Sequence, residues 1–322
     1  MFSFRKTVKS KPLIDNRYKI LNQIGEGSFG YIYLGEDTKR KLEVAIKVER
    51  KKKEHKQLDN ERNMYTALKG GSGIPCIYYF GSYNKTRVLV MERLGPNIED
   101  LYNFCGREFS LKTILLLMDQ LLDRIEFIHS KGIVHRDIKP QNFLTGVEDN
   151  RNIVFITDFG LSKFYCNPKT KKHNAFCRNR ELVGTARFAS INTHTGCEQS
   201  RRDDIEAIGY CALYLLKGKL PWQGLVAETQ LQKHEKVVEK KISVPIEDLC
   251  KGLPDEFAIF TRYARKLRFE ESPDYNYLRH LFENLYTSLD FKNDDIYDWN
   301  LLKAGSISTN KEGSTYAVDS FL

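Results

Sequence analysis

The fold of this chain is decided by the stretch His135-Arg136-Asp137-Ile138-Lys139-Pro140-Gln141-Asn142, together with the triplet Asp158-Phe159-Gly160 a short way downstream. Transfer of a phosphoryl group from ATP needs a carboxylate that orients and deprotonates the acceptor hydroxyl, and oxygen ligands that hold magnesium on the phosphates. Asp137 matches the first need, and Asn142 and Asp158 match the second. Because chance clusters of charged residues rarely reproduce this spacing, it predicts ATP and Mg2+ as cofactors.

A glycine-rich stretch lies upstream, with Gly25, Gly27 and Gly30 spaced as in loops that cover phosphates. Alone this signal is weak, because dinucleotide-binding folds use the same spacing. A dinucleotide fingerprint opens directly into a helix, whereas apolar residues alternate at period two over 32–34 and 44–48 here, which predicts a hairpin of strands. The predicted nucleotide-binding residues of this region are Ile24, Gly25, Glu26, Gly27, Ser28, Phe29, Gly30, Tyr31, Ile32, Ala45 and Lys47.

Lys47 shares one face of its predicted strand with Ala45, opposite the apolar side chains of that strand. A lone lysine in a strand is usually a solvated edge residue. The stretch from Gln57 to Leu68, however, has apolar residues at roughly helical spacing with Glu61 among them. We therefore expect Glu61 to form an ion pair with Lys47 and to fix its ammonium group against the phosphates.

The run from Arg87 to Met91 predicts a buried strand that ends at Glu92, and a hinge between two lobes is expected there. Leu94-Gly95-Pro96 follows, and although a Gly-Pro pair is more often a plain turn, its position here favours a hinge. Main-chain groups of Glu92 and Leu94 could then hydrogen-bond the adenine edge, and Met91 would limit the depth of the pocket.

Composition agrees with an enzyme of this size. The chain has 322 residues, 41% of them hydrophobic and 29% charged, which is enough to bury a full core. Its seven cysteines show no paired metal-ligand spacing and follow no signal peptide, so reduced thiols without disulfides are expected. The apolar stretch 114–128 contains charged residues and predicts an amphipathic helix capped by Ser110. Phe2 excludes myristoylation, and no membrane anchor is expected.

The formal net charge of +9 allows a nucleic-acid-binding interpretation. The run Arg50–Lys53 with Lys56 is interpreted as a solvated approach to the 57–68 helix, with a nuclear-import or nucleic-acid patch as the alternative. No RNA- or DNA-reading motif is present, so no stable nucleic-acid binding is expected. A second basic set follows Gly160 and indicates acidic or phosphorylated substrates: Lys163, Lys169, Lys171, Lys172, Arg178, Arg180 and Arg187.

These parts match the established protein kinase template, and within it the chain resembles the casein kinase I family. The matching motifs lie at residues 24–30, 70–75, 94–96, 135–140, 184–192 and 198–204. The decisive one is Ser190-Ile191-Asn192, which stands where most protein kinases carry Ala-Pro-Glu. The resemblance runs from about Tyr18 to about Lys303, nearly the whole chain.

The resemblance implies an α+β, two-lobed protein kinase fold with a β-rich N-lobe and a larger, mostly helical C-lobe. The implied boundaries are an N-terminal extension 1–17, a kinase domain 18–303 and a disordered tail 304–322, with an N-lobe 18–93, a hinge at about 92–96 and a C-lobe 97–303. It further implies a monomeric serine/threonine kinase of the cytoplasm and nucleus. Substrates would be proteins with an acidic or phosphorylated residue three places before the target, in DNA repair, vesicle traffic or signalling.

Roles carry over onto individual residues. Lys139 resembles the lysine that touches the transferred phosphate in serine/threonine kinases, and Thr185 fits that pattern. Asp204 resembles a buried acid that hydrogen-bonds the backbone of the catalytic loop, although a helix-start carboxylate is the plainer interpretation. Two anion pockets are implied, one from Arg187, Gly224 and Lys233 for the substrate phosphate, the other from Arg136, Lys163 and Arg180, filled in other kinases by a phosphorylated activation loop.

Two alternatives to an active kinase remain, a pseudokinase scaffold and a basic nucleic-acid-binding protein. A scaffold would typically lack one of five residues, all of which are present: Lys47, Glu61, Asp137, Asn142 and Asp158. The chain departs from its animal relatives near Lys233, where Val226, Gln230 and Leu231 replace basic residues. Targeting that depends on that stretch is therefore in doubt.

Overall fold

The structure is a computed structural model that describes residues 13–27, 30–50, 57–292 and 294–303. Several predictions lie outside these residues: the roles of Ser28 and Phe29, the basic run beyond Arg50, and the disordered tail 304–322.

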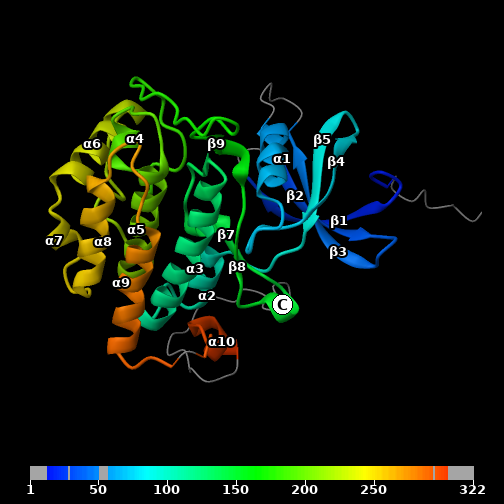
Figure 1. Cartoon of the computed structure of the whole chain (residues 1–322). Coiled ribbons are helices and arrows are strands. Elements are labelled where there is room, and N and C mark those ends of the chain that lie inside the picture. Colours follow the sequence, from blue (N-terminus) through cyan, green and yellow to red (C-terminus); the bar gives the residue numbers. More distant parts are fainter. Residues whose placement is uncertain (1–12, 28–29, 51–56, 293, 304–322) are drawn as a thin grey trace, which may run out of the picture.

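The N-terminal half is a five-stranded antiparallel sheet with the strand order β1-β2-β3-β5-β4 (Figure 1). Its strands are β1 (Tyr18–Glu26), β2 (Gly30–Asp37), β3 (Leu42–Glu49), β4 (Ile77–Tyr83) and β5 (Thr86–Glu92). Val44 and Ile46 are buried on one face of β3 against Val88 and Val90, as the alternating pattern predicts. Helix α1 (Gln57–Leu68) contacts β5 and has the bounds expected from its apolar spacing.

The C-terminal half is mainly helical. Its helices are α2 (Ile98–Phe104), α3 (Leu111–Ser130), α4 (Ile191–His194), α5 (Arg201–Lys217), α6 (Gln230–Ser243), α7 (Ile246–Leu249), α8 (Asp255–Lys266), α9 (Tyr275–Ser288) and α10 (Asp298–Lys303). Two short strand pairs join them, β6 (Ile133–Val134) with β9 (Lys163–Phe164) and β7 (Phe143–Thr145) with β8 (Val154–Ile156). Three short 3-10 turns complete this half: η1 (Pro140–Asn142), η2 (Glu148–Asn150) and η3 (Phe159–Leu161). The predicted α+β, two-lobed architecture is confirmed.

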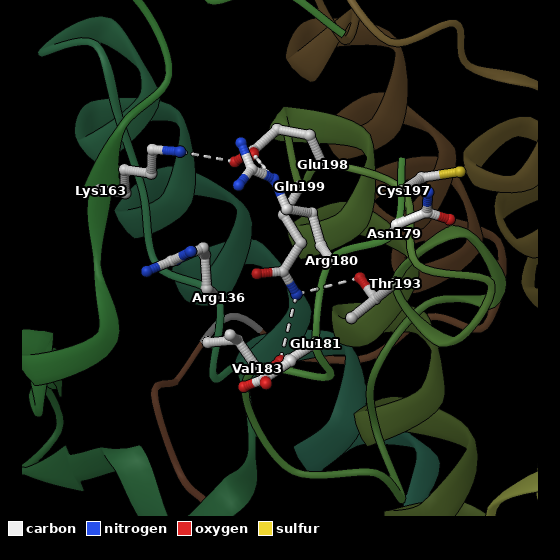
Figure 2. A pocket seen from close by; sticks show the side chains of 10 residues that line it. All are labelled: Arg136, Lys163, Asn179, Arg180, Glu181, Val183, Thr193, Cys197, Glu198 and Gln199. Carbon is white, nitrogen blue, oxygen red and sulfur yellow. Dashed lines mark hydrogen bonds and ion pairs between the residues drawn. The ribbon is translucent and has the colours of Figure 1, made fainter. Parts of the chain in front are cut away.

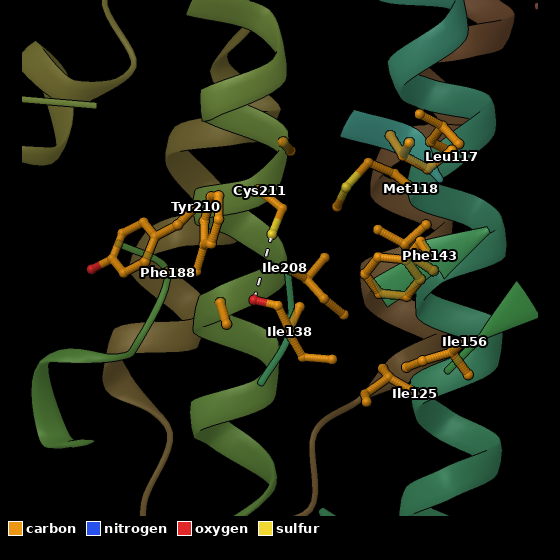
Figure 3. Packing of buried hydrophobic residues seen from close by; sticks show 14 of the residues in the cluster. Leu117, Met118, Ile125, Ile138, Phe143, Ile156, Phe188, Ile208, Tyr210 and Cys211 are labelled. Atoms are coloured by element: carbon orange, nitrogen blue, oxygen red, sulfur yellow. Dashed lines mark hydrogen bonds between the residues drawn. The ribbon is translucent and has the colours of Figure 1, made fainter. Parts of the chain in front are cut away.

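Helix α3 is the central support of this half. It begins after Ser110, whose hydroxyl accepts a hydrogen bond from the Thr113 amide at 3.2 Å, so the predicted cap is present. One face of the helix is fully buried: Ile114, Leu117, Leu121, Ile125 and Ile128. Full burial of each such side chain contributes about 1.5–3 kcal/mol. Figure 3 shows Ile138, inside the predicted catalytic loop, and Phe143, directly after it, packed between α3 and α5. The loop is therefore held by two rigid helices.

The link between the halves is tied to β7. The Gly95 amide donates to the Thr145 carbonyl at 2.8 Å, and the Thr145 amide donates to the Pro96 carbonyl at 3.0 Å. A Cβ at Gly95 would lie 2.6 Å from the Thr145 hydroxyl, so the close approach requires glycine.

Within the described ranges, no helix is both long enough and apolar enough to cross a membrane. All seven cysteines lie in the described part of the chain and are free thiols.

Candidate active site

Asp204, in the first turn of α5, holds the backbone of the predicted catalytic loop. Its Oδ2 accepts from the His135 amide at 2.7 Å and its Oδ1 from the Arg136 amide at 2.9 Å. The ring of His129 adds a third contact, with Nε2 at 3.0 Å from Oδ2. Burial would raise the pKa of Asp204, but His129 and the loop amide lower it below its usual value, so this carboxylate is ionised. The predicted contact with the loop backbone is confirmed.

Arg136 gives the loop an unusual shape, because its φ of 69° lies in the left-handed region that side chains disfavour. Such a conformation costs of order 1–3 kcal/mol and persists only where neighbouring contacts hold it. The bond from its amide to Asp204 is one such contact. It fixes the backbone directly before Asp137.

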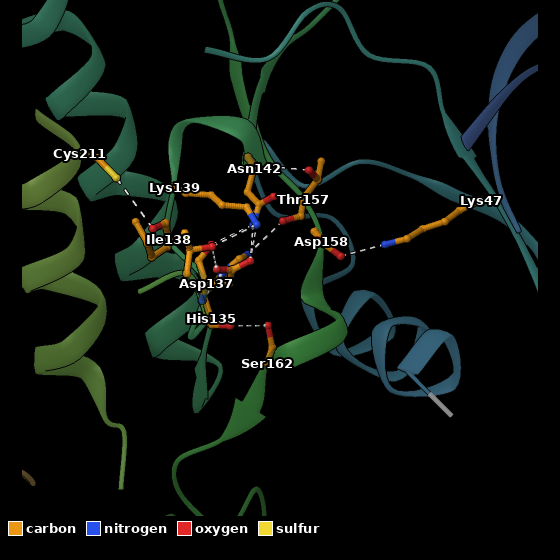
Figure 4. A network of polar contacts seen from close by, with 11 residues as sticks. Lys47, His135, Asp137, Ile138, Lys139, Asn142, Thr157, Asp158, Ser162 and Cys211 are labelled. Carbon is orange, nitrogen blue, oxygen red and sulfur yellow. Dashed lines mark hydrogen bonds and ion pairs between the residues drawn. The ribbon is translucent and has the colours of Figure 1, made fainter. Parts of the chain in front are cut away.

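The carboxylate of Asp137 is held on both oxygens (Figure 4). Lys139 Nζ lies 2.6 Å from Oδ2, and the Thr185 hydroxyl donates to Oδ1 at 2.7 Å. Lys139 Nζ also lies 3.4 Å from the Thr185 hydroxyl, so the three side chains form one cluster. Asn142 Nδ2 donates to the Asp137 carbonyl at 2.8 Å and fixes the base from the other side. An acceptor hydroxyl that reaches Asp137 would meet a base of fixed orientation beside a cation.

Lys47 joins the two halves of the molecule. Its Nζ lies 2.7 Å from Glu61 Oε2 and 2.8 Å from Asp158 Oδ1, so the ion pair expected with Glu61 is present. Burial would lower the pKa of Lys47, but the charges of Asp158 and Glu61 raise it above its usual value. The ammonium group therefore stays charged and is held where phosphates could meet it.

A stack of rings connects α1 to the catalytic loop. Tyr65 packs edge-on against Phe159 at 4.9 Å between ring centroids, and Phe159 packs against His135 at 5.1 Å. Asn60 Nδ2 donates to the carbonyls of Gly160 and Ser162, each at 3.0 Å. Sequence reasoning placed Tyr65 on the apolar face of the helix but missed these contacts, because nothing local in the sequence indicates them.

The glycine-rich stretch forms the predicted hairpin between β1 and β2. The Gly27 amide donates to the Gly30 carbonyl at 2.9 Å. A Cβ on Gly30 would lie 2.0 Å from the Val48 carbonyl oxygen, so only glycine fits there. The side chain of Glu26 is ion-paired with Arg50.

At the predicted adenine edge, Met91 is buried with 8% exposure. The Glu92 amide donates to the Cys76 carbonyl at 2.8 Å, so the main-chain contact expected between Glu92 and the adenine edge would be made by the Glu92 carbonyl. β4 and β5 are consecutive strands joined by the two-residue turn Asn84-Lys85, and this hairpin brings Cys76 beside Glu92.

Asn142 and Asp158 offer an amide oxygen and a carboxylate, a donor set that fits Mg2+. This ion is held by one or two carboxylates together with substrate phosphates and retains water ligands. The described residues contain no cluster of three or more His, Cys, Asp or Glu side chains of the kind that cages a metal. The Asn142 amide nitrogen is turned to the Asp137 carbonyl, so its oxygen is the atom that could bind the ion.

Of the two expected anion pockets, the structure forms one as a cavity. It has a volume of about 350 Å3, and its lining includes Arg136, Lys163 and Arg180 (Figure 2). The side chain of Glu198 enters this pocket, with Oε1 2.7 Å from Lys163 Nζ and Oε2 2.8 Å from Arg180 Nε. Sequence reasoning missed this carboxylate, although it belongs to the motif 198–204.

The residues of the other expected anion pocket, Arg187, Gly224 and Lys233, have separate contacts. The Arg187 guanidinium lies over the rings of Phe188 and Tyr214, with centroids at 5.6 and 5.2 Å. Gly224 adopts a φ of 73°, and Lys233 lies in α6. Within the described part of the chain, no hydrogen bond or ion pair links these three residues to one another.

A buried lysine supports the segment that carries Thr185 and Arg187. Lys241 has no exposed surface, and its ammonium donates to the carbonyl of Ala186 at 3.0 Å and to that of Ala189. The Ala186 carbonyl also lies 3.0 Å from Nε2 of His194. Sequence reasoning missed Lys241, because a lysine on a polar helix normally lies in solvent.

The geometry agrees with a comparison against known families. The family model described as protein kinase domain matches residues 18–267, which extend from β1 through α8.

Proposed function

Because this chain belongs to the protein kinase domain family, we propose that it transfers the γ-phosphate of ATP to serine or threonine hydroxyls of acidic or phosphate-primed protein substrates, in the manner of casein kinase I. The observation that carries this proposal is the cluster of Asp137, Lys139 and Thr185, which places a fixed base beside a fixed cation.

The roles follow from these contacts. Asp137 orients the acceptor hydroxyl and takes its proton. Lys139 neutralises negative charge that develops on the phosphoryl group during transfer. Lys47, held by Glu61, positions the phosphates of the nucleotide. Magnesium, held by Asn142 and Asp158, would neutralise charge on the phosphates.

The serine/threonine preference is supported by Lys139. Its ammonium lies within hydrogen-bonding distance of both the Asp137 carboxylate and the Thr185 hydroxyl. This bridge connects the catalytic loop to the segment 184–190, beside which a peptide acceptor would lie. It also places a positive charge close to a short acceptor side chain.

The preference for acidic or primed substrates is supported by charge. Arg187 follows Thr185 closely in the chain and forms no ion pair with a carboxylate among the described residues. A contact between its guanidinium and a phosphate is a charge-assisted hydrogen bond worth roughly 1.5–3 kcal/mol. That range corresponds to a preference of about tenfold to a hundredfold for the primed substrate.

The test is phosphate transfer from Mg-ATP to two peptides that differ only in a phosphoserine three residues before the acceptor serine. Each peptide is assayed with the unaltered protein, with Arg187→Ala, and with Arg262→Ala as a matched control whose arginine pairs with Glu247 on the surface. We expect Arg187→Ala to remove most of the preference for the primed peptide and Arg262→Ala to leave it intact. Equal rates on the two peptides would keep the kinase and remove this recognition mechanism. Absence of transfer would favour the pseudokinase scaffold.

A further inference from the structure

We propose that Glu198 is the resident anion of the pocket formed by Arg136, Lys163 and Arg180, and that it positions the activation segment in place of a phosphorylated side chain. In many kinases, phosphorylation orders the activation loop by adding a charge that arginines can pair. Here the charge would come from a carboxylate of the chain itself. This inference rests on the proposed kinase function and deepens it.

The two oxygens of Glu198 are bound by different segments. Oε1 is held by Lys163 of β9, which follows Asp158-Phe159-Gly160, and Oε2 is held by Arg180 from the later part of the activation segment. The carboxylate side chain is only 6% exposed, whereas Arg180 remains 52% exposed. Glu198 therefore joins the beginning of the activation segment, at Lys163, to its later part, at Arg180. We call these two contacts the clasp. Figure 2 shows these cations around the carboxylate.

Arg136 connects this clasp to the catalytic base. Its guanidinium donates through Nε to the Leu161 carbonyl at 2.6 Å, and it forms no ion pair within the described residues. Burial lowers the pKa of Arg136, and the charge of Glu198 is the main influence that opposes this effect. Because Asp137 follows Arg136 directly, a displacement of Arg136 caused by a change in the charge of the pocket would also displace the backbone of the base.

The backbone around Glu198 holds the carboxylate in place. The Glu198 amide donates to the Cys177 carbonyl at 2.9 Å, and the Arg180 amide donates to the Gly196 carbonyl at 3.0 Å. Gln199 adds side-chain bonds to the Val183 carbonyl at 3.2 Å and to the Thr193 hydroxyl at 2.9 Å. Hydrogen bonds thus fix the chain on both sides of the clasp, so the Glu198 side chain has a defined position in the pocket.

The charge of Glu198 fits this role. Burial would raise its pKa, but the hydrogen bond from Lys163 and the charges of Lys163, Arg180 and Arg136 lower it below the usual value. Glu198 is therefore ionised at neutral pH. The two carboxylates of the lining, Glu198 and the exposed Glu181, do not neutralise its three cations, and a phosphate would carry a charge of about −1.5 to −2. The pocket thus keeps a positive excess while its central position is already filled.

The experiment measures kcat on an unprimed peptide for Glu198→Gln and Glu198→Ala. Glu239→Gln is the matched control, because Glu239 is an exposed carboxylate on α6, outside the lining of this pocket, and makes no ion pair in the described part of the chain. We expect Glu198→Gln to lower kcat by about tenfold or more and Glu239→Gln to leave it unchanged. Acetate replaces the atoms that Glu198→Ala removes, so it should restore this variant in a saturable manner. Chloride at the same ionic strength should not restore the activity of this variant.

Acetate rescue separates a positioning role from a general loss of structure. Because Arg180 is half exposed, Arg180→Gln should fold and should lower kcat as well, and combining it with Glu198→Gln should cost less than the sum of the two effects. An unchanged kcat in Glu198→Gln, or independent effects of the two changes, would overturn the inference. So would equal stimulation of the unaltered protein by acetate, which would indicate an external anion as the resident. Failure of the unaltered protein to transfer phosphate would instead overturn the proposed function.

Discussion

Replacement of Asp204 by asparagine tests how the catalytic loop is held. The carboxylate accepts from two loop amides and contacts His129, all within 3.0 Å. In Asp204→Asn, the remaining oxygen can serve the Arg136 amide, and the new NH2 group can donate to His129 if that ring presents an acceptor. The NH2 group then faces the His135 amide, which loses its acceptor in a buried place.

The magnitude follows from this accounting. An unsatisfied buried amide costs about 1–3 kcal/mol, and the loss of a charge-assisted bond adds about 1 kcal/mol or more. We therefore expect the free energy of unfolding to fall by about 2–4 kcal/mol. The strained backbone of Arg136 would also relax, and a small displacement of Asp137 should lower kcat at least tenfold, since misplacement by about 1 Å can cost about a hundredfold.

The assay combines denaturant unfolding with kcat measured where each variant is fully folded. Asp203→Asn is the control: its carboxylate is buried one residue earlier in α5 but bonds Ser190 and Ser200, and none of its hydrogen bonds reaches the catalytic loop. Both variants should change stability, and only Asp204→Asn should lower kcat of the folded enzyme. Equal kcat values for Asp204→Asn and the unaltered protein would refute the reasoning.

Two further predictions concern the segment beside the base. A Cβ on Gly184, whose φ is 96°, would lie 2.2 Å from the Arg136 carbonyl oxygen, so Gly184→Ala should abolish most activity. Gly252→Ala is the control, because Gly252 also has a positive φ, of 81°, but has open space around it. This control should lower the free energy of unfolding by only about 1 kcal/mol and should leave kcat unchanged. Burial, together with the charge of Lys241, lowers the pKa of His194 to about 4. The unfolded chain therefore binds the extra proton between about pH 6.5 and 4, and the contribution of His194 alone should lower the free energy of unfolding by up to about 3 kcal/mol as the pH drops through this window. His194→Gln should reduce this dependence in unfolding curves recorded across the range, and an unchanged slope would contradict the assignment.

Much of the framework could be predicted because its signals are local. The period of apolar residues gave the bounds of α1, and the serine before α3 marked its start. The Lys47 and Glu61 pair could be predicted because a kinase template fixes which strand and helix face each other. Such inferences need only spacing and one topological rule.

The contacts that were missed depend on tertiary packing. Glu198 lies far along the chain from Lys163, and nothing local indicates that its carboxylate would enter a basic pocket. Lys241 lies on a helix with a mostly polar sequence, and its burial is explained by the carbonyls of Ala186 and Ala189 and by the rings of Tyr210 and Trp222, each 4.9 Å from its ammonium.

The most direct test of the central claim is transfer of labelled γ-phosphate from Mg-ATP to an acidic peptide mixture with serine, threonine or tyrosine as the acceptor. We expect label on serine and threonine but not on tyrosine. Asp137→Asn should reduce the rate by about 10²–10⁴-fold, the range that a positioned general base contributes. Absence of transfer by the unaltered protein, transfer to tyrosine at a similar rate, or an Asp137→Asn variant of full activity would contradict the account.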